Sequence, residues 1–329
     1  MAPSPLSIVP LPDELSKSSQ IGAEVVLPSG MRYLSLENLT AQEKATLRDG
    51  LYQHGVLVGK FFDETAGETH SAGRKMVTDK RNILSENRGA RNPRATQVGI
   101  IGKGRFENVE GCLNLDLKHV DHTEFHENPL STKEIDQGFT RPYRWHMDMP
   151  LNGNLPGYVT TIHCVQAPDL PDQKIKFPDQ DMPIPAAATA FLSGARAFEL
   201  LTPEEKEFSL NTTILCAPRA YEWMRECKAT EDGMTIAKVG KERPLEELHN
   251  NLSYPREKDV SSSLESRLCP ENIYAYRWAD GDFVIFHNCG CLHSITGTLM
   301  GPTDGDDKER RLLWQCNMMS GTPPQLFRA

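Results

Sequence analysis

Two residues at a spacing of two, His146 and Asp148, offer the clearest chemistry in this sequence. They lie in residues 143–149, which we predict to be a β-strand, and side chains two apart on a strand point to the same side. A histidine far downstream, His293, follows a strongly apolar stretch and is expected to return to them from a neighbouring strand. Two imidazoles and one carboxylate on one face bind ferrous iron and leave coordination positions open. These three residues therefore predict an iron centre.

A cation on the next predicted strand supports this hypothesis. The planar guanidinium of Arg311 suits a carboxylate bidentately. A dicarboxylate co-substrate that chelates iron through a 2-oxo acid end needs such a cation for its far carboxylate, and the hydroxyl of Thr189 would be a further donor. Arg310 would point the other way on a strand. An ordinary salt bridge of Arg311 remains the alternative.

The other histidines favour structural or surface roles. His-x-Asp also arises by chance in a chain with ten histidines, so the pair alone is weak evidence. The spacing of His119, His122 and His126 resembles a zinc cluster, but it has no cysteine partner at a useful distance. His163 and His287 stand alone in predicted strands.

The chain turns from mixed to strand-rich after residue 142. Thr40 and Thr202 begin capping boxes and predict helices that start at residues 41 and 203, and Ser193 is expected to cap a further helix over 194–201. Residues 219–227 and 69–78 are further helix candidates. Strands are predicted over residues 21–26, 56–62, 97–104, 158–165, 187–192, 211–216, 273–278, 282–287 and 311–317.

Composition excludes several classes of protein. The 329 residues carry a net charge of −9 and no basic run, so we expect no nucleic-acid partner. No stretch approaches the roughly 18–20 apolar residues of a membrane span, and the N-terminus is not a secretory signal. The eight cysteines are expected to be reduced, as in a cytoplasmic protein.

We predict a flexible arm over residues 1–20 and one domain over 21–329, with a charged lid or insertion at 228–270.

Several blocks in a fixed order carry a resemblance to a known family. They are Trp145-His146-x-Asp148, the segment 188–194, Trp278-x-x-Gly281-Asp282 with His287-Asn288, Leu292-His293-Ser294, and Arg311. Together they resemble the taurine/2,4-D dioxygenase (TauD/TfdA) family. The resemblance implies a double-stranded β-helix, or jelly roll, with flanking helices. It also implies Fe(II) on His146, Asp148 and His293, and 2-oxoglutarate on Arg311 and Thr189. Dioxygen and a small-molecule substrate complete the reaction, which releases succinate and CO2. His287 and Asn288 become candidates for orienting the imidazoles.

Within this family the chain is most similar to fungal xanthine dioxygenases. That similarity places Gln97, Lys118 and Asn317 at the substrate. The chain departs from those enzymes at Gly99 and Ile135, where they carry polar residues, and its insertion is shorter. A site built to hydrogen-bond a polar substrate depends on such groups. The sequence therefore favours another small polar substrate, such as an amino acid in fungal secondary metabolism. That substrate would be hydroxylated or cyclised, as in aziridine formation from valine. Xanthine hydroxylation to urate and a catalytically silent jelly-roll binding protein remain the alternatives.

Overall fold

The structure, a computed structural model, describes most of the chain. The described residues are 5–12, 19–31, 34, 39–60, 91–92, 95–109, 112–117, 125–148, 157–212, 227–238, 268–296 and 307–319. The helices within them are α2 (Ala41–His54), α5 (Thr132–Asp136), α6 (Gly194–Glu199), α7 (Pro203–Asn211), η5 (Pro270–Asn272) and η6 (Asp307–Glu309). The strands are β1 (Ser7–Pro10), β2 (Ala23–Val26), β3 (Val56–Lys60), β4 (Arg91–Asn92), β5 (Ala95–Val109), β6 (Cys112–Leu117), β7 (Phe139–Thr140), β8 (Gly157–Gln166), β9 (Gln173–Lys176), β10 (Asp181–Ile184), β11 (Thr189–Ser193), β12 (Lys228–Ala229), β13 (Ile236–Lys238), β14 (Ile273–Tyr276), β15 (Asp282–His287), β16 (Cys291–Ile295) and β17 (Arg311–Met319).

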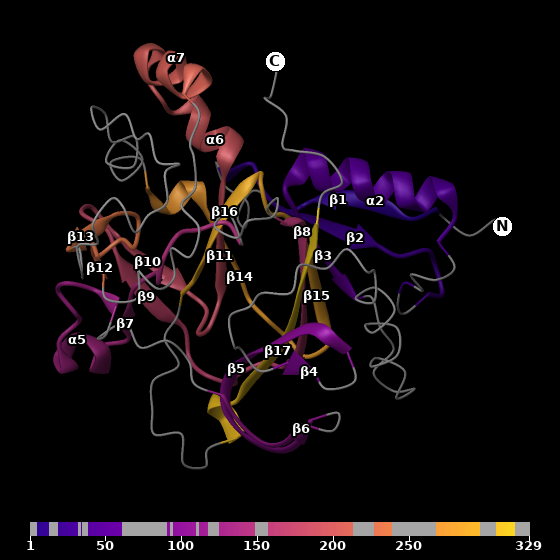
Figure 1. The fold of residues 1–329 in the computed structure, drawn as a ribbon, viewed down its shortest axis with the longest axis horizontal. Helices are drawn as coiled ribbons and strands as arrows, with labels where there is room; N and C mark the ends of the chain where they lie inside the picture. The colour runs from indigo at the N-terminus through magenta and orange to yellow at the C-terminus, as the bar shows by residue number, and fades with distance from the viewer. Residues whose placement is uncertain are drawn as a thin grey trace, which may run out of the picture.

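Two sheets form the body of the molecule. The larger has the order β1-β2-β3-β15-β8-β17-β5-β4, with β6 paired beside β5, and the smaller has the order β14-β11-β16 (Figure 1). An apolar cluster joins them, with Phe191 and Tyr274 from the smaller sheet packed against Ile162, Phe286 and Leu313 from the larger. Two sheets closed over one apolar core make a jelly roll, so the predicted fold is confirmed.

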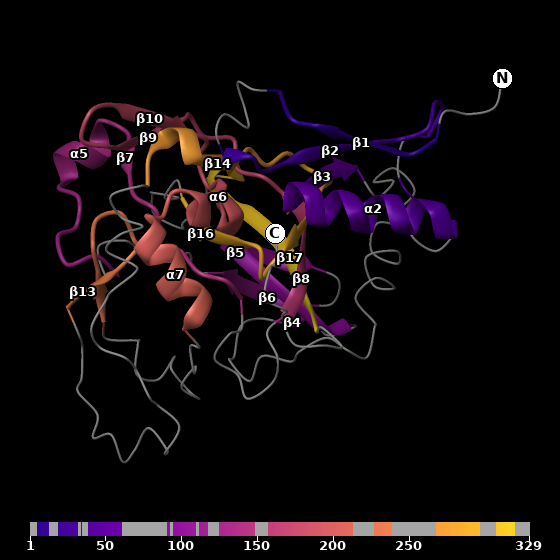
Figure 2. The ribbon, with the colours of Figure 1, turned by 90° about the horizontal axis from the view of Figure 1, so that it is seen from above.

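Strand β15 lies in the middle of the larger sheet, and its sequence is a continuous apolar run because both of its faces are buried. Val284 and Phe286 face the cluster between the sheets. Phe283 and Ile285, which alternate with them, face a second cluster that contains Leu51 of α2. Helix α2 lies along this outer face, beside β3 (Figure 2). Both faces of β15 are therefore covered, which removes the polar alternation of a half-exposed strand.

The helix starts follow the sequence signals. Thr40 Oγ1 accepts a hydrogen bond from Glu43 N at 3.2 Å, and Thr40 N donates to the Glu43 carboxylate at 2.8 Å. Thr202 and Glu205 form the same reciprocal box at the start of α7. Each box satisfies backbone N–H groups that have no partner within the helix. The predicted starts at residues 41 and 203 are confirmed.

The strand predicted over residues 211–216 needs correction at its start. Asn211 is the last residue of α7. Its side-chain Nδ2 donates to Glu207 O at 2.8 Å, and Ser209 Oγ donates to Glu205 O at 2.8 Å. These polar side chains bond back to the preceding turn and extend the helix. Residues 213–216 lie outside the described residues, as do the helix candidates at 69–78 and, apart from Cys227, 219–227.

The N-terminal arm is also more ordered than the sequence predicted. Strand β1 pairs antiparallel with β2, from Ser7 opposite Val26 to Pro10 opposite Ala23. Leu6 is buried, and Ile8 packs against the same cluster as helix α2. Apolar side chains at these positions tie this part of the arm to the edge of the larger sheet. Residues 1–4 and 13–18 lie outside the described residues.

Residues 143–148 are extended, but they do not form the regular strand that the sequence predicted. Tyr143 N donates to Ile295 O at 2.8 Å, whereas Trp145 N donates to Gly233 O at 3.1 Å. Tyr143 thus bonds to β16, whereas Trp145 bonds to the segment around Gly233. The regular ladder that the sequence predicted is therefore reduced to an isolated bridge between His146 and His293. The extended conformation is kept because both sides of the segment are paired.

A hairpin of β12 and β13 supplies one of these partners. The indole Nε1 of Trp145 donates to Asp232 O at 3.0 Å, beside the backbone bond from Trp145 to Gly233. The Asp232 carboxylate fixes the turn by accepting from Met234 N at 3.0 Å. The segment predicted as a lid therefore begins as a docked hairpin. Its remainder, 239–267, lies outside the described residues, and Leu268 beyond it is buried.

No helix in the described part of the chain is both long and apolar enough to cross a membrane. No two of the cysteines that the structure describes are joined in a disulfide.

Candidate metal centre

Backbone pairing brings the two distant histidines together. His146 N donates to His293 O at 3.0 Å, and His293 N donates to His146 O at 2.8 Å. His293 is the middle residue of β16, opposite Phe191 of β11, so it comes from a neighbouring strand that follows the apolar strand β15, as the sequence predicted. This register directs the His293 ring into the core beside Phe286, with 4.9 Å between ring centroids.

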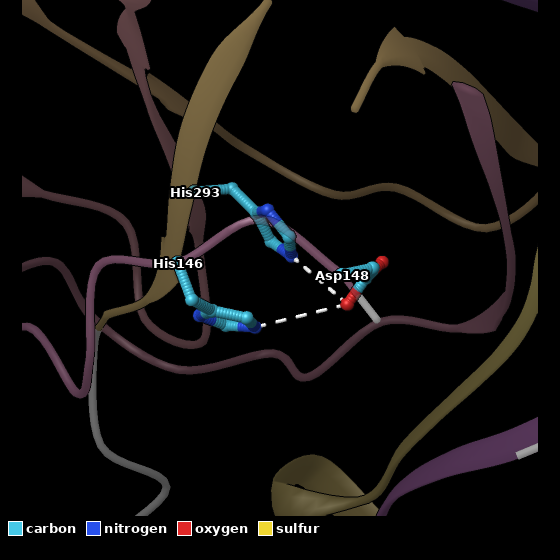
Figure 3. A group of neighbouring side chains, drawn as sticks. All are labelled: His146, Asp148 and His293. Carbon is cyan, nitrogen blue, oxygen red and sulfur yellow. Dashed lines mark ion pairs between the residues drawn. The ribbon is translucent and has the colours of Figure 1, made fainter. Parts of the chain in front are cut away.

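The three predicted ligands converge (Figure 3). Asp148 Oδ1 lies 3.8 Å from His146 Nε2 and 3.6 Å from His293 Nε2. One ligand atom from each residue lies within 4.8 Å of the others, and this is the single group of its kind among the described residues. Side-chain exposure rises from 5% at His293 through 13% at Asp148 to 30% at His146. The group is therefore buried on the His293 side and open toward His146.

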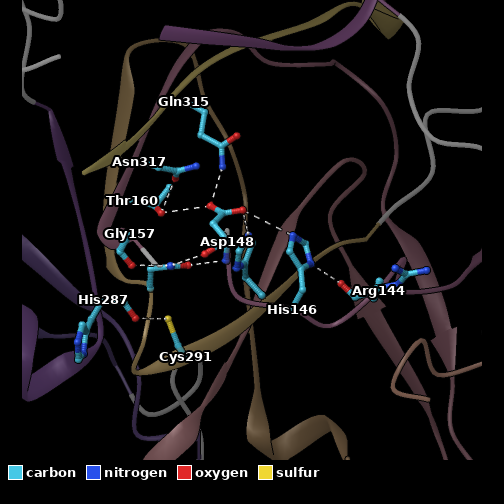
Figure 4. A network of polar contacts seen from close by, with 11 residues as sticks. Arg144, His146, Asp148, Gly157, Thr160, His287, Cys291, Gln315 and Asn317 are labelled. Atoms are coloured by element: carbon cyan, nitrogen blue, oxygen red, sulfur yellow. Dashed lines mark hydrogen bonds and ion pairs between the residues drawn. The ribbon is translucent and has the colours of Figure 1, made fainter. Parts of the chain in front are cut away.

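Both imidazoles turn Nε2 toward Asp148. His146 Nδ1 lies 2.7 Å from Arg144 O and donates a hydrogen bond to it, which fixes the orientation of the ring (Figure 4). Burial, followed by the neighbouring His146, lowers the pKa of His293 to about 3. A metal-bound histidine must be neutral, and these surroundings keep His293 neutral before any metal arrives.

Asp148 is held at its backbone and at its carboxylate. Asp148 N donates to Asn288 Oδ1 at 2.7 Å, and Asn288 Nδ2 donates to Asp148 O at 2.9 Å. The carboxylate Oδ2 accepts from Gln315 Nε2 at 2.9 Å and from Thr160 Oγ1 at 3.2 Å. The other oxygen, Oδ1, faces the two histidines. The sequence suggested that Asn288 orients an imidazole. The structure shows instead that the fully buried Asn288 holds the backbone of Asp148.

His287, the other expected orienting residue, has a different place. Its ring packs against Tyr158 and Tyr52, with centroid distances of 4.8 and 5.3 Å. Figure 4 shows it turned away from Asp148. Side chains alternate along β15, so His287 shares the outer face with Ile285, while Phe286 faces the metal centre.

Arg311 is a buried cation without a partner among the described residues. It is 1% exposed, its Nε makes no hydrogen bond, and no ion pair joins it to a described carboxylate. Burial lowers the pKa of Arg311 to about 10, which leaves the guanidinium charged at neutral pH. An isolated buried charge is costly, so this site suits an anionic ligand. The arrangement fits the far carboxylate of 2-oxoglutarate.

Of the remaining predicted site residues, the structure describes the side chains of Thr189 and Asn317 but not those of Gln97 and Lys118. Thr189 Oγ1 accepts from Trp278 Nε1 at 3.1 Å, which leaves the hydroxyl hydrogen available to donate. Asn317 lies on β17 and contacts Thr160. Gln97 belongs to β5, but its side chain is not described, and Lys118 lies outside the described residues.

The two positions at which a departure from xanthine dioxygenases was predicted, Gly99 and Ile135, are among the described residues. Gly99 lies opposite Gln315 in the β5–β17 ladder, so it adds no side chain beside that amide. Ile135 lies in α5, next to Glu134, whose carboxylate is bound to Ser131 in a capping box.

Of the three histidines in the zinc-like spacing, His119 and His122 lie outside the described residues. His126 is buried, with Nε2 3.0 Å from Pro142 O.

Two side chains at the centre were missed by sequence reasoning, namely Thr160 and Gln315. Gln315 shares a face of β17 with Arg311 because residues 311, 313, 315 and 317 alternate with outward-facing ones. That periodicity could have identified Gln315 once Arg311 was chosen. Thr160 had no such signal, because its role depends on which strand lies beside β8.

The hairpin against Trp145 yields a testable prediction. Gly233 and Gly138 both have φ in the left-handed region, at 71° and 82°. A Cβ at Gly233 would overlap the Tyr143 carbonyl oxygen, whereas one at Gly138 would meet nothing within 4 Å. Gly233→Ala should therefore displace the chain that leads into His146 and weaken metal binding about tenfold, the lower end for groups that orient a ligand.

The matched control is Gly138→Ala, which should lose about 1–2 kcal/mol of stability through backbone strain alone and keep its metal affinity. Urea unfolding and Co(II) titration of both variants make the comparison. Equal metal affinities in the two variants would show that the hairpin does not position the centre.

A jelly roll that carries two histidines, one carboxylate and a buried arginine with no partner among the described residues defines the class of iron- and 2-oxoglutarate-dependent oxygenases. Residues 10–317 match the Taurine catabolism dioxygenase TauD, TfdA family, and the chain belongs to it. It is a dioxygenase that uses Fe(II), 2-oxoglutarate and O2.

Curated relatives and solved structures agree with this assignment. The alpha-ketoglutarate-dependent xanthine dioxygenase xanA of Emericella nidulans is 31% identical over 347 residues, covering 88% of this chain and 91% of the relative. The corresponding xan-1 of Neurospora crassa is 29% identical, covering 96% and 87%. The crystal structure of a taurine dioxygenase from Burkholderia xenovorans has the same fold, with a TM-score of 0.52 at 17% identity, over 95% of this chain and 89% of that one.

Proposed function

We propose that His146, Asp148 and His293 bind Fe(II), that Arg311 and Thr189 bind 2-oxoglutarate, and that the enzyme oxidises a C–H bond of a small polar molecule. The observation that carries this proposal is the convergence of one ligand atom from each of the three residues within 4.8 Å. The donor set is that of non-haem iron oxygenases, and it leaves positions for a co-substrate and dioxygen.

Charge supports the assignment of 2-oxoglutarate to Arg311. Asp148 brings one negative charge and Arg311 one positive charge to a largely buried region. A divalent cation and a dianionic 2-oxo acid together add no net charge, so the filled site would be neutral. Buried charges are tolerated when each has a partner. A catalytically silent binding protein would have no need for this matched set, which argues against that alternative.

Iron with 2-oxoglutarate and dioxygen supplies the oxidising chemistry and releases succinate and CO2. The residues of this chain bind and orient. His146 keeps its proton on Nδ1 against Arg144 O, so Nε2 stays available as a ligand. His293 lies in an apolar wall with Phe191 and Phe286, which excludes water from the reacting side. Arg311 fixes the far end of the co-substrate bidentately.

For the substrate, we propose an amino acid or a similar small polar amine. Two observations favour this over a purine. Gly99 adds no side chain opposite Gln315, and Ile135 is apolar where the resemblance to xanthine dioxygenases implies a polar residue. Xanthine is the second candidate, because two relatives that cover most of this chain are named xanthine dioxygenases.

The deciding experiment measures succinate formed from 2-oxoglutarate under air, with and without added Fe(II), across a panel of xanthine, valine and other branched amino acids. Iron-dependent succinate that rises with one panel member identifies the substrate class. An amino acid that succeeds where xanthine fails supports the first candidate, and the reverse result selects xanthine. No succinate with any compound, in protein that binds Fe(II), would contradict the oxygenase assignment.

A further inference from the structure

The two oxygens of the Asp148 carboxylate lie in different surroundings. Oδ1 faces His146 Nε2 and His293 Nε2, at 3.8 and 3.6 Å. Oδ2 lies 2.9 Å from Gln315 Nε2 and 3.2 Å from Thr160 Oγ1 (Figure 4). One oxygen is therefore directed at the metal position, and the other is occupied by donors from the protein.

These donors come from neighbouring strands of the larger sheet. Thr160 of β8 lies opposite Asn317 of β17, and Gln315 lies opposite Ile162. Gln315 and Asn317 project to the same face of β17, two residues apart. Two carboxamides and one hydroxyl thus line the side of Asp148 that is turned away from His293.

The hydroxyl of Thr160 has a single hydrogen, which decides how this group is bonded. Its Oγ1 lies 2.7 Å from Asn317 Oδ1 and 3.2 Å from Asp148 Oδ2, which are both acceptors. It cannot donate to two oxygens at once. With the Asn317 amide turned over, Nδ2 donates to Thr160 Oγ1 and the Thr160 hydroxyl donates to Asp148 Oδ2. The donors then run from Asn317 through Thr160 to Asp148.

We propose that Gln315 and Thr160 are positioning residues that hold Oδ2 of Asp148, so that the carboxylate offers the metal Oδ1 alone. Asn317 sets the direction of the Thr160 hydrogen. This inference rests on the proposed iron site and assigns a role to residues that the ligand set does not include. A carboxylate that binds through both oxygens occupies one more coordination position than a one-oxygen ligand. Holding Oδ2 therefore keeps that position for the co-substrate or dioxygen.

The test uses Co(II) as the probe, in the full-length protein without 2-oxoglutarate. Thr160→Val and Gln315→Leu each remove one donor. Each should weaken Co(II) binding by about tenfold or more, in the range found for groups that orient metal ligands. Each should also change the Co(II) absorption intensity, because a carboxylate freed to bind through both oxygens alters the coordination number. Chelator competition gives the affinity, and urea unfolding of the metal-free protein reports folding.

Two controls separate positioning from packing. Thr160→Ser keeps the hydroxyl and should retain the affinity and spectrum of the wild type. Thr161→Val removes a hydroxyl from a residue equally buried on the opposite face of β8, and it should also leave Co(II) binding unchanged. A merely structural role predicts that Thr160→Val and Thr161→Val lose stability alike and bind Co(II) alike.

The outcomes are distinguishable. If the wild type and all four variants bind Co(II) equally and with one spectrum, the positioning role is wrong while the iron site stands. If Thr160→Val fails to fold, Gln315→Leu decides the matter, because Gln315 is only half-buried and acts on the same oxygen. If the wild type itself binds no Co(II), the proposed metal site is overturned and this inference with it.

Discussion

Replacing His146 by alanine should lower iron-dependent succinate formation by more than about 100-fold, the upper end of the effect of groups that only orient a ligand. His146 Nε2 is one of the three ligand atoms that converge on the centre. Without it, the metal keeps one imidazole and one carboxylate, and its affinity falls with its activity. The measurement is succinate release from 2-oxoglutarate under air at saturating Fe(II), together with Co(II) titration of the variant.

The matched control is His287→Ala. His287 lies on the outer face of β15, against Tyr52 and Tyr158. Its loss removes a ring of the same size without touching Asp148, so metal binding and succinate formation should stay near those of the wild type. If both variants retain activity, the assignment of His146 as a ligand is wrong. If both lose activity with their fold intact, the centre extends to a part of the sheet that these contacts do not indicate.

Replacing Arg311 by methionine should have opposite effects on co-substrate binding and on the stability of the empty protein. The KM for 2-oxoglutarate should rise by at least about tenfold, because a hydrogen bond to a charged group contributes roughly 1.5–3 kcal/mol. The protein without co-substrate should be as stable as the wild type, or more stable by up to roughly 4 kcal/mol, because an apolar side chain replaces a buried charge that has no partner in the described part of the chain. Steady-state kinetics and urea unfolding measure the two effects.

Three further measurements test the role of Arg311. Saturating 2-oxoglutarate should raise the unfolding midpoint of the metal-loaded wild type and not that of Arg311→Met, since a ligand stabilises only the state that binds it. Arg311→Lys should fall between them, because an ammonium cannot bind a carboxylate through a planar fork. Arg310→Met changes the neighbour beside Phe106 and should leave the KM unchanged. A loss of stability in Arg311→Met with an unaltered KM would instead indicate a structural role for this arginine.

The local elements of the fold were predictable because their signals lie within a few residues. The capping boxes of Thr40 and Thr202 were assigned correctly, since the donor and acceptor groups stand three positions apart. The bounds of β15 follow from an uninterrupted apolar run. Asn211 was misassigned because its side chain bonds back into α7, a choice that its neighbours in sequence do not reveal.

The segment that carries His146 and Asp148 shows how a site can be predicted through an imperfect element. The sequence suggested a regular strand, whereas the structure has an extended segment with partners on two sides. His146 and Asp148 still lie close together, because side chains two residues apart in an extended chain point to the same side even where the chain forms no ladder. The docked hairpin that holds Trp145 was not foreseen, because Gly233 and Asp232 have meaning only where they contact the main chain of a distant segment.

The sequence by itself determined the strand-rich class of the fold and the residue types of the candidate ligands and of the candidate cation for the co-substrate, because residue chemistry and short-range periodicity are written in one dimension. Only the tertiary structure decided that β16 delivers His293 to His146 and that β8 and β17 bring Thr160 and Gln315 to one oxygen of Asp148. Those contacts depend on which strands become neighbours and in which register. That choice is made by the packing of the whole core, and no local pattern contains it.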